Sequence, residues 1–99
     1  MADKYQPKPI QVDHITLSRE ILELVERLAE NADEIWAHQR ISEGWVFGTE
    51  RCDRTRRHPC LLPYSQLPES EKNYDRNAVL ETMRAVLALG FVVSKSPSG

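Results

Sequence analysis

The chain has 99 residues, of which 40% are hydrophobic, and its formal net charge at pH 7 is −2. This length suits one domain with a single modest core, and a slightly acidic chain is not expected to bind nucleic acid through its whole surface. No apolar run approaches the roughly 18 residues that cross a bilayer, and the N-terminus lacks the apolar core of a signal peptide. The composition therefore predicts a soluble, cytoplasmic protein with no membrane contact.

The first residues are predicted to form a proline-rich extended arm. Pro7 and Pro9 are separated by one residue, which favours a polyproline-like course of the chain. We expect residues 1–8 to be flexible, and we expect residues 9–17 to lie down on the domain because they are partly apolar. The domain itself is predicted over residues 9–93.

An amphipathic helical unit is predicted after the arm. Ser18 is a good N-cap residue, and Gly44 is placed to end the helix in a left-handed conformation. Apolar residues between them recur every three or four positions, which is the period of a helix with one buried face. These residues are Ile21, Leu24, Val25, Leu28, Ala32, Ile35 and Trp36. Asn31 and Glu34 are spaced as a capping box, so the pattern fits one long helix to Ser42 or two helices bent at Asn31, and we expect the bend.

A short strand and a polar loop are predicted next. The residue types over 45–47 favour an extended strand, and the loop over 49–58 is locally basic because it contains four arginines. Cys52, His58 and Cys60 are donors of the kind that zinc uses, but their spacing fits no common zinc site. No metal is therefore expected, and the two cysteines are expected to be thiols.

A second amphipathic helical unit is predicted from Pro68, because proline suits the first position of a helix. Asp75 is placed to cap a second segment, and Gly90 is the expected C-terminal cap. Residues 91–93 are expected to form a strand that pairs with residues 45–47.

The predicted fold class is therefore mainly α. It consists of two packed amphipathic helical units, a short two-stranded β element and the proline-rich extended N-terminal arm. Residues 94–99 are expected to be a disordered tail.

Short motifs spread over residues 5–93 point to one family. They are Tyr5-x-Pro-x-Pro-Ile10, Leu-Ala-Glu-Asn31, Trp36-Ala with Arg40-Ile41, Gly44-Trp45-x-Phe47-Gly48, His58-Pro59-Cys60-Leu61-x-Pro63-Tyr64, Leu67-Pro68, Glu71-Lys72 and Leu87-x-Leu89-Gly90. Together they resemble the RyR repeat domain, which is found in pairs in ryanodine receptors and as single copies in microbial proteins. The resemblance implies a mainly helical, non-catalytic module, similar to the cytoplasmic regulatory repeats of those calcium-release channels. Phe47 stands where many repeats have tyrosine.

The two tryptophans and a nearby arginine are the candidate ligand site. Trp36 and Arg40 are four residues apart and share a helix face, and Trp45 would fold back beside them. Two indoles with an arginine can stack a planar base and pair with a phosphate. We expect a cleft lined by Trp36, Arg40, Trp45 and Tyr64, with Arg57 and His58 adding positive charge. The alternative is that both tryptophans are core residues and Arg40 is a surface cation beside one of them.

Two functions stay open from the sequence. The first is an interaction module that docks a protein partner or a second copy through an apolar patch near residues 45–47 or along the arm. The second is a sensor of an adenine nucleotide or nucleotide derivative. We find no nucleophile placed with a base, and no cofactor is expected. Glu71 and Asp75 are four apart on the second helix and are expected to form surface ion pairs with Lys72 and Arg76.

Overall fold

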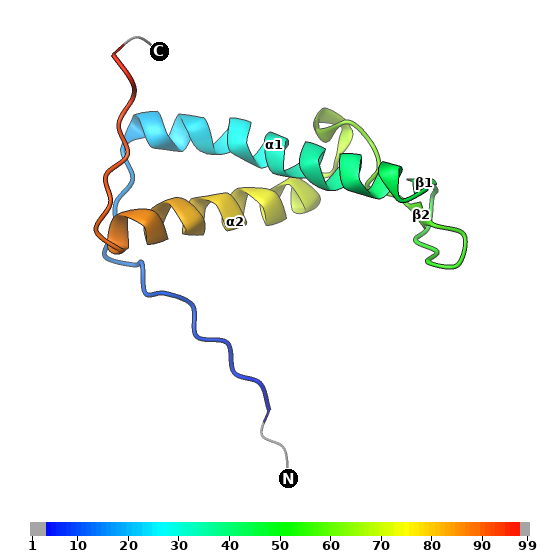
Figure 1. The fold of residues 1–99 in the computed structure, drawn as a ribbon, viewed down its shortest axis with the longest axis horizontal. Coiled ribbons are helices and arrows are strands. Elements are labelled where there is room, and N and C mark those ends of the chain that lie inside the picture. The colour runs from blue at the N-terminus through cyan, green and yellow to red at the C-terminus, as the bar shows by residue number, and fades with distance from the viewer. Residues whose placement is uncertain (1–3, 98–99) are drawn as a thin grey trace.

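The computed structural model describes residues 4–97. Its two helices lie side by side and run in opposite directions, and the arm leaves the pair at one end (Figure 1). The elements in order are α1 (Arg19–Ser42), β1 (Val46–Phe47), β2 (Arg57–His58), the 3-10 helix η1 (Tyr64–Gln66) and α2 (Glu69–Ala88). This order confirms the predicted fold of two packed helices with a small β element.

α1 begins and ends where the sequence predicts. The Ser18 Oγ accepts a hydrogen bond from the backbone N–H of Ile21 at 3.3 Å, so Ser18 is the N-cap. At the other end, Gly44 has a φ of 93°, which lies in the left-handed region that favours glycine. The backbone N–H of Trp45 then donates to the carbonyl of Arg40 at 3.0 Å, which closes the C-terminal turn.

The bend predicted at Asn31 is wrong, because α1 is one continuous helix. Its buried positions follow one another in steps of four, at Ile21, Val25, Ala29 and Asp33. An asparagine inside a helix costs only about 0.5 kcal/mol relative to alanine. A break would interrupt this buried stripe and leave backbone groups without helical partners. Packing along the stripe therefore overrides the capping signal of Asn31 and Glu34.

The strand pairing also differs from the prediction. β1 pairs in parallel with β2, with Val46 opposite Arg57 and Phe47 opposite His58. Residues 91–93 form no strand. Because the helices are antiparallel, the end of α2 lies near the start of α1 (Figure 1), and β1 follows the opposite end of a helix about 36 Å long. Residues 91–93 therefore cannot reach β1.

α2 is a single helix that starts one residue after the predicted position. Pro68 is its N-cap, with φ −60° and ψ 151°, and the helix begins at Glu69. Asp75 lies inside α2 and caps no second segment, so that prediction is wrong. Gly90 has a φ of 97° and ends the helix as expected. Within residues 4–97, neither helix contains a stretch apolar enough to span a bilayer.

The buried core is thin and lies between α1 and the chain that leads into α2. Ala29 of α1 packs with Tyr64 and Leu67, and half-buried side chains of the connection and α2 surround them. Val12 and Leu17 at the base of the arm are buried as well. The arm therefore lies down on the domain from Val12 onward, and the contact predicted for residues 9–11 is wrong because these residues are exposed.

The two chain ends were expected to be a flexible arm over residues 1–8 and a disordered tail over 94–99. Residues 4–11 are exposed and form no helix or strand, and neither do residues 94–97. The rest of both predictions, at residues 1–3 and 98–99, lies outside the described part of the chain.

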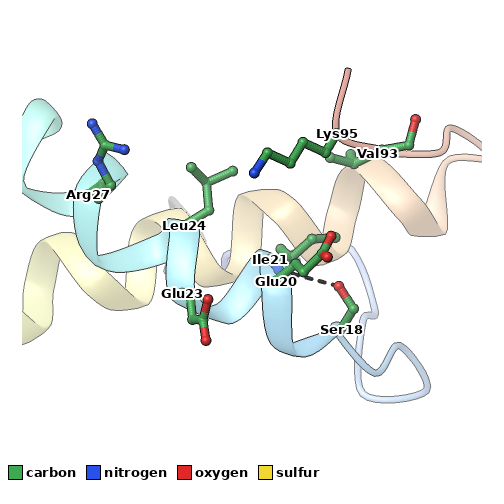
Figure 2. A pocket seen from close by; sticks show the side chains of 9 residues that line it. Ser18, Glu20, Ile21, Glu23, Leu24, Arg27, Val93 and Lys95 are labelled. Atoms are coloured by element: carbon green, nitrogen blue, oxygen red, sulfur yellow. Dashed lines mark hydrogen bonds between the residues drawn. The ribbon is translucent and has the colours of Figure 1, made fainter. Parts of the chain in front are cut away.

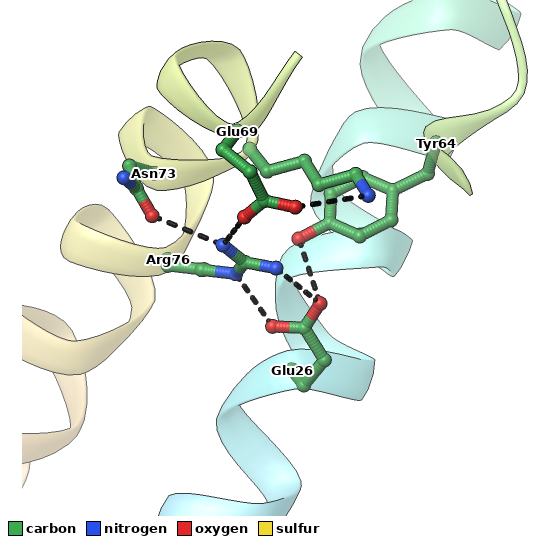
Figure 3. Close-up of polar contacts among 6 residues, drawn as sticks. Glu26, Tyr64, Glu69, Asn73 and Arg76 are labelled. Carbon is green, nitrogen blue, oxygen red and sulfur yellow. Dashed lines mark hydrogen bonds and ion pairs between the residues drawn. The ribbon is translucent and has the colours of Figure 1, made fainter. Parts of the chain in front are cut away.

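A polar network fastens α2 to α1 (Figure 3). Arg76 donates from Nε to Glu26 Oε2 at 2.6 Å and from Nη2 to Glu26 Oε1 at 2.9 Å. Its Nη1 donates to Glu69 Oε2 at 2.6 Å and to Asn73 Oδ1 at 3.0 Å. The hydroxyl of Tyr64 donates to Glu26 Oε1 at 3.2 Å. Arg76 thus holds one carboxylate from each helix, and we call these residues the Arg76 network.

Candidate functional site

Four of the predicted site residues lie against one another near the C-terminal end of α1. The rings of Trp36 and His58 meet edge-on, with centroids 5.0 Å apart, and the rings of His58 and Trp45 are 6.3 Å apart. The Cζ atom of Arg40 lies 5.7 Å from the centroid of the Trp45 ring, within the range of a cation–π contact. We call the series Trp36, His58, Trp45 and Arg40 the ring stack.

Helix spacing and the small β element build the ring stack together. The four-residue spacing of Trp36 and Arg40 puts both on one face of α1. The pairing of β1 with β2 then brings His58 between the two indoles. The Nδ1 atom of His58 accepts a hydrogen bond from the backbone N–H of Cys60 at 3.0 Å. Burial first, and then the positive charge of Arg51, lowers the pKa of His58, so its imidazole is neutral at pH 7.

The remaining two predicted residues do not join the ring stack. Tyr64 follows Pro63 into η1, which buries its ring in the core and directs its hydroxyl to Glu26. Arg57 is exposed on β2 and its side chain passes close to Gly48, where an added Cβ would lie 2.6 Å from the Arg57 Cβ. Because Tyr64 is buried in the core, it lines no open cleft with the tryptophans and Arg40 in the part of the chain that the structure describes. Both tryptophans are half-buried.

A cleft of about 240 Å³ opens beside the ring stack, between α1 and α2. Its rings come from Trp36, His58 and Tyr74, and its carboxylates come from Asp33, Glu71 and Asp75. No lysine or arginine of the described chain lines it. We call this cleft, whose carboxylates come from both helices, the acidic cleft.

Asp33 is the buried member of the acidic cleft. Its residue is only 6% exposed, and within residues 4–97 no hydrogen-bond partner reaches its Oδ2 atom. Burial first, and then the negative charge of Asp75 and Glu34, raises the pKa of Asp33 to about 6. Burial and the neighbouring Glu71 likewise raise the pKa of Asp75. The acidic cleft therefore concentrates negative charge that is poorly solvated and not neutralised by a nearby cation.

A sequence model of the RyR domain family matches residues 5–95 of the chain. The chain belongs to the RyR domain family. The match includes both helices, the ring stack and the acidic cleft. The whole candidate site thus lies inside the RyR domain, and the resemblance seen in the motifs is confirmed.

Sequence reasoning missed the acidic cleft of this RyR domain, although one signal pointed to it. Asp33 occupies the next position of the buried stripe, four residues after Ala29, where an apolar residue would be usual. Glu71 and Asp75 were expected to pair with Lys72 and Arg76, which is wrong. Lys72 pairs with Glu69 at 3.5 Å, and Arg76 pairs with Glu26 and Glu69. The neighbouring cations on α2 are therefore engaged outside the cleft.

Two arginines of the basic loop, Arg51 and Arg56, make polar contacts within the RyR domain. Arg56 Nη1 donates to the carbonyl of Glu43 at the end of α1, where a cation is favourable for the helix dipole. Arg51 Nε pairs with Asp53 Oδ1 at 2.9 Å. Cys52 and Cys60 are free thiols, as expected. Within residues 4–97, no group of three or more His, Cys, Asp or Glu side chains is arranged to hold a metal ion.

A larger hollow of about 470 Å³ lies at the other end of α1, against the chain that follows α2 (Figure 2). Its walls mix apolar side chains such as Leu24 and Val93 with charges of both signs, including Glu23, Arg27 and Lys95. No aromatic ring is among its described lining residues. Because it concentrates neither rings nor one sign of charge, we place the candidate site at the ring stack and acidic cleft.

Proposed function

We propose that this RyR domain is a non-catalytic interaction module that docks a protein surface. The observation that supports this function concerns the hydrophobic residues of the described chain. More large hydrophobic side chains are exposed to solvent than hydrophobic side chains are buried in the core. Large exposed apolar patches are typical of interaction sites. Ile41, Val46 and Phe47 are three of these exposed side chains, at the end of α1 and in β1, and we call them the apolar end.

The chemistry of the nearby groups supports a non-catalytic role. The Nδ1 atom of His58 is already used to accept the Cys60 N–H. Burial and the negative charge of Glu71 raise the pKa of the Cys60 thiol, so the reactive thiolate is disfavoured at neutral pH. A histidine in contact with the tryptophan rings and a protonated thiol do not form a nucleophile and base.

Substitution of the apolar end tests the docking function. We expect the double variant Val46→Ser, Phe47→Ser to weaken association about tenfold or more. The reason is that the two serine side chains bury less apolar surface on binding than valine and phenylalanine do. Light scattering over a range of protein concentrations measures self-association, and pull-downs with purified candidate partners measure binding to other proteins. Val92→Ser is the control, because Val92 is 88% exposed at the opposite end of the domain. A wild-type chain that stays monomeric and retains no partner would contradict the function.

A second candidate is a sensor of an adenine nucleotide or nucleotide derivative, and the contact between Arg40 and Trp45 favours it. A base would stack near Trp45 while its phosphate pairs with Arg40, whose side chain is 39% exposed. The phosphate would replace Glu43, whose Oε1 lies 3.0 Å from Arg40 Nη1. The phosphate would lie on the Arg40 side of the ring stack, because the carboxylates of the acidic cleft repel it.

Tryptophan fluorescence tests the sensor directly. We expect ATP or ADP-ribose to quench the emission of wild-type protein and Arg40→Ala to abolish the quenching, because the variant loses the cation that pairs with phosphate. Ligand at a hundredfold excess over its Kd would stabilise the domain by about 2.7 kcal/mol, which a thermal-shift assay detects. Absence of both quenching and thermal shift across a nucleotide panel excludes this candidate.

A further inference from the structure

The acidic cleft has a chemistry that neither protein docking at the apolar end nor nucleotide binding at Arg40 uses. We propose that it binds a guanidinium group, carried by a small molecule or by an arginine side chain of another protein. This site goes beyond the proposed function, because the cleft lies between α1 and α2 and contains no residue of the apolar end.

The carboxylates of the cleft are placed to surround a cation. Asp33 lines the cleft from α1, and Glu71 and Asp75 line it from α2, where their four-residue spacing puts them on one face. The Oδ2 of Asp33 is buried and has no hydrogen-bond partner in residues 4–97. A buried carboxylate oxygen without a partner is unfavourable, and a charged N–H donor from a ligand would satisfy it. A ligand donor that reached this oxygen would therefore satisfy an acceptor that no donor of the described chain satisfies.

The rings of the cleft favour guanidinium over other cations. Guanidinium is planar and weakly hydrated, it stacks on aromatic rings, and its fork of donors pairs with carboxylates through two parallel hydrogen bonds. Trp36 and Tyr74 supply rings beside the three carboxylates. A primary ammonium is a more strongly hydrated point charge and gains less from such walls.

The volume of the cleft sets the size of what it holds. Sites that enclose a whole drug-sized ligand usually measure about 300–1,000 Å³. A cleft of about 240 Å³ suits one head group and the first part of an aliphatic chain. The remainder of the ligand would extend past the exposed Tyr74, so both a free guanidino compound and an arginine side chain fit this description.

Titration with agmatine tests the site, with 1,4-diaminobutane as the ammonium comparison of equal charge. We expect saturable binding of agmatine in calorimetry, with shifts of amide resonances on the facing turns of α1 and α2, and about tenfold weaker binding of 1,4-diaminobutane. Asp33→Asn and Asp75→Asn should each lower the affinity for agmatine about tenfold or more. Asp13→Asn is the matched control, because it removes the same charge from the exposed arm and should leave the affinity unchanged. Melting curves verify that each variant is folded.

A blocked tripeptide with a central arginine distinguishes the two sources of the group. Tighter binding of the peptide than of agmatine identifies a protein partner, and the reverse identifies a small molecule; either result supports the guanidinium site. No saturable binding at millimolar agmatine, equal binding of 1,4-diaminobutane, or affinities unchanged in both Asp33→Asn and Asp75→Asn would overturn it. The Val46→Ser, Phe47→Ser variant should bind agmatine like the wild type. Docking and guanidinium binding can thus fail separately.

Discussion

Asp33→Asn should raise the stability of the ligand-free RyR domain at pH 8 by about 2 kcal/mol, or about 10 °C in melting temperature. Asp33 is buried, its Oδ2 has no partner in the described chain, and the negative charges of Asp75 and Glu34 add to the cost of ionising it. Asparagine keeps the shape of the side chain and removes the charge. The variant should therefore stabilise the fold, although most substitutions of buried residues destabilise.

The effect of Asp33 on stability has a defined pH window. Its pKa is about 6 in the folded protein and 3.8 ordinarily, so the folded state binds a proton more tightly than the unfolded state does. Protonation then favours folding, and that stability is lost as pH rises from 3.8 through about 6. The gain in Asp33→Asn should be complete above pH 7 and should shrink to nearly nothing by pH 4.

Thermal denaturation of both proteins between pH 4 and pH 8 measures this window. The pKa values of Asp75 and His58 near the cleft are also shifted, but taking the difference between the two proteins largely removes their contribution. Asp13→Asn changes the net charge equally, and its free energy of unfolding should lie within about 0.5 kcal/mol of the wild-type value at every pH. A variant that melts at or below the wild type at pH 8, or a gain that does not depend on pH, would show that Asp33 is compensated within the fold.

A side chain that lowers the stability of its own fold is typical of a functional site. The same Asp33→Asn variant should gain stability and lose affinity for guanidinium. A purely structural role for Asp33 predicts neither change, because a structural residue stabilises the fold it belongs to.

Local chemistry made the helix boundaries predictable. Ser18 as the N-cap, and Gly44 and Gly90 as left-handed residues after the helices, depend only on the nearest turns of the chain. The shared face of Trp36 and Arg40 follows from helix periodicity alone. These predictions succeeded because each depends on residues no more than about four positions apart.

Tertiary packing decided the features that sequence reasoning missed. His58 reaches the tryptophans only through the parallel pairing of β2 with β1, and no local pattern specifies which short strand is the partner. The acidic cleft exists because α2 turns Glu71 and Asp75 toward Asp33. Helix periodicity shows which residues share a face but not which face meets another helix. The position of Asp33 in the buried stripe is the one local sign of the cleft.

Arg76→Ala should lower the melting temperature at pH 7 by roughly 5–8 °C, because it removes the two parallel hydrogen bonds to Glu26 and the contact with Glu69. The hydrogen bond from Arg76 is the main cause that lowers the pKa of Glu26. A carboxyl with a lowered pKa stabilises the fold above its ordinary value of 4.5, and that stability is lost as pH falls through the folded pKa. The difference between the melting temperatures of wild type and variant should therefore shrink as pH falls below 4.5.

Arg19→Ala is the control for Arg76→Ala. Arg19 pairs with Glu23 at 3.3 Å, but its side chain is 92% exposed, so its loss should change the melting temperature by no more than about 2 °C. The loss of melting temperature in Arg76→Lys should lie between those of Arg19→Ala and Arg76→Ala, because lysine keeps the charge but lacks the planar fork of donors. Equal losses in Arg19→Ala and Arg76→Ala would mean that the Arg76 network adds nothing beyond a surface ion pair.

The Arg76 network also explains why Arg76 does not neutralise the carboxylates of the acidic cleft. Arg76 directly follows Asp75 in the chain, yet its guanidinium points to Glu26 and Glu69 (Figure 3). The contact that holds α2 against α1 thus keeps the nearest cation away from Asp75 and Asp33.

In Arg76→Ala, the loosened contact between the helices should weaken agmatine binding even though a positive charge has been removed. Simple long-range attraction predicts the opposite, since loss of a cation would strengthen the binding of agmatine. Weaker binding in this variant would therefore show that the cleft depends on the positions of its carboxylates.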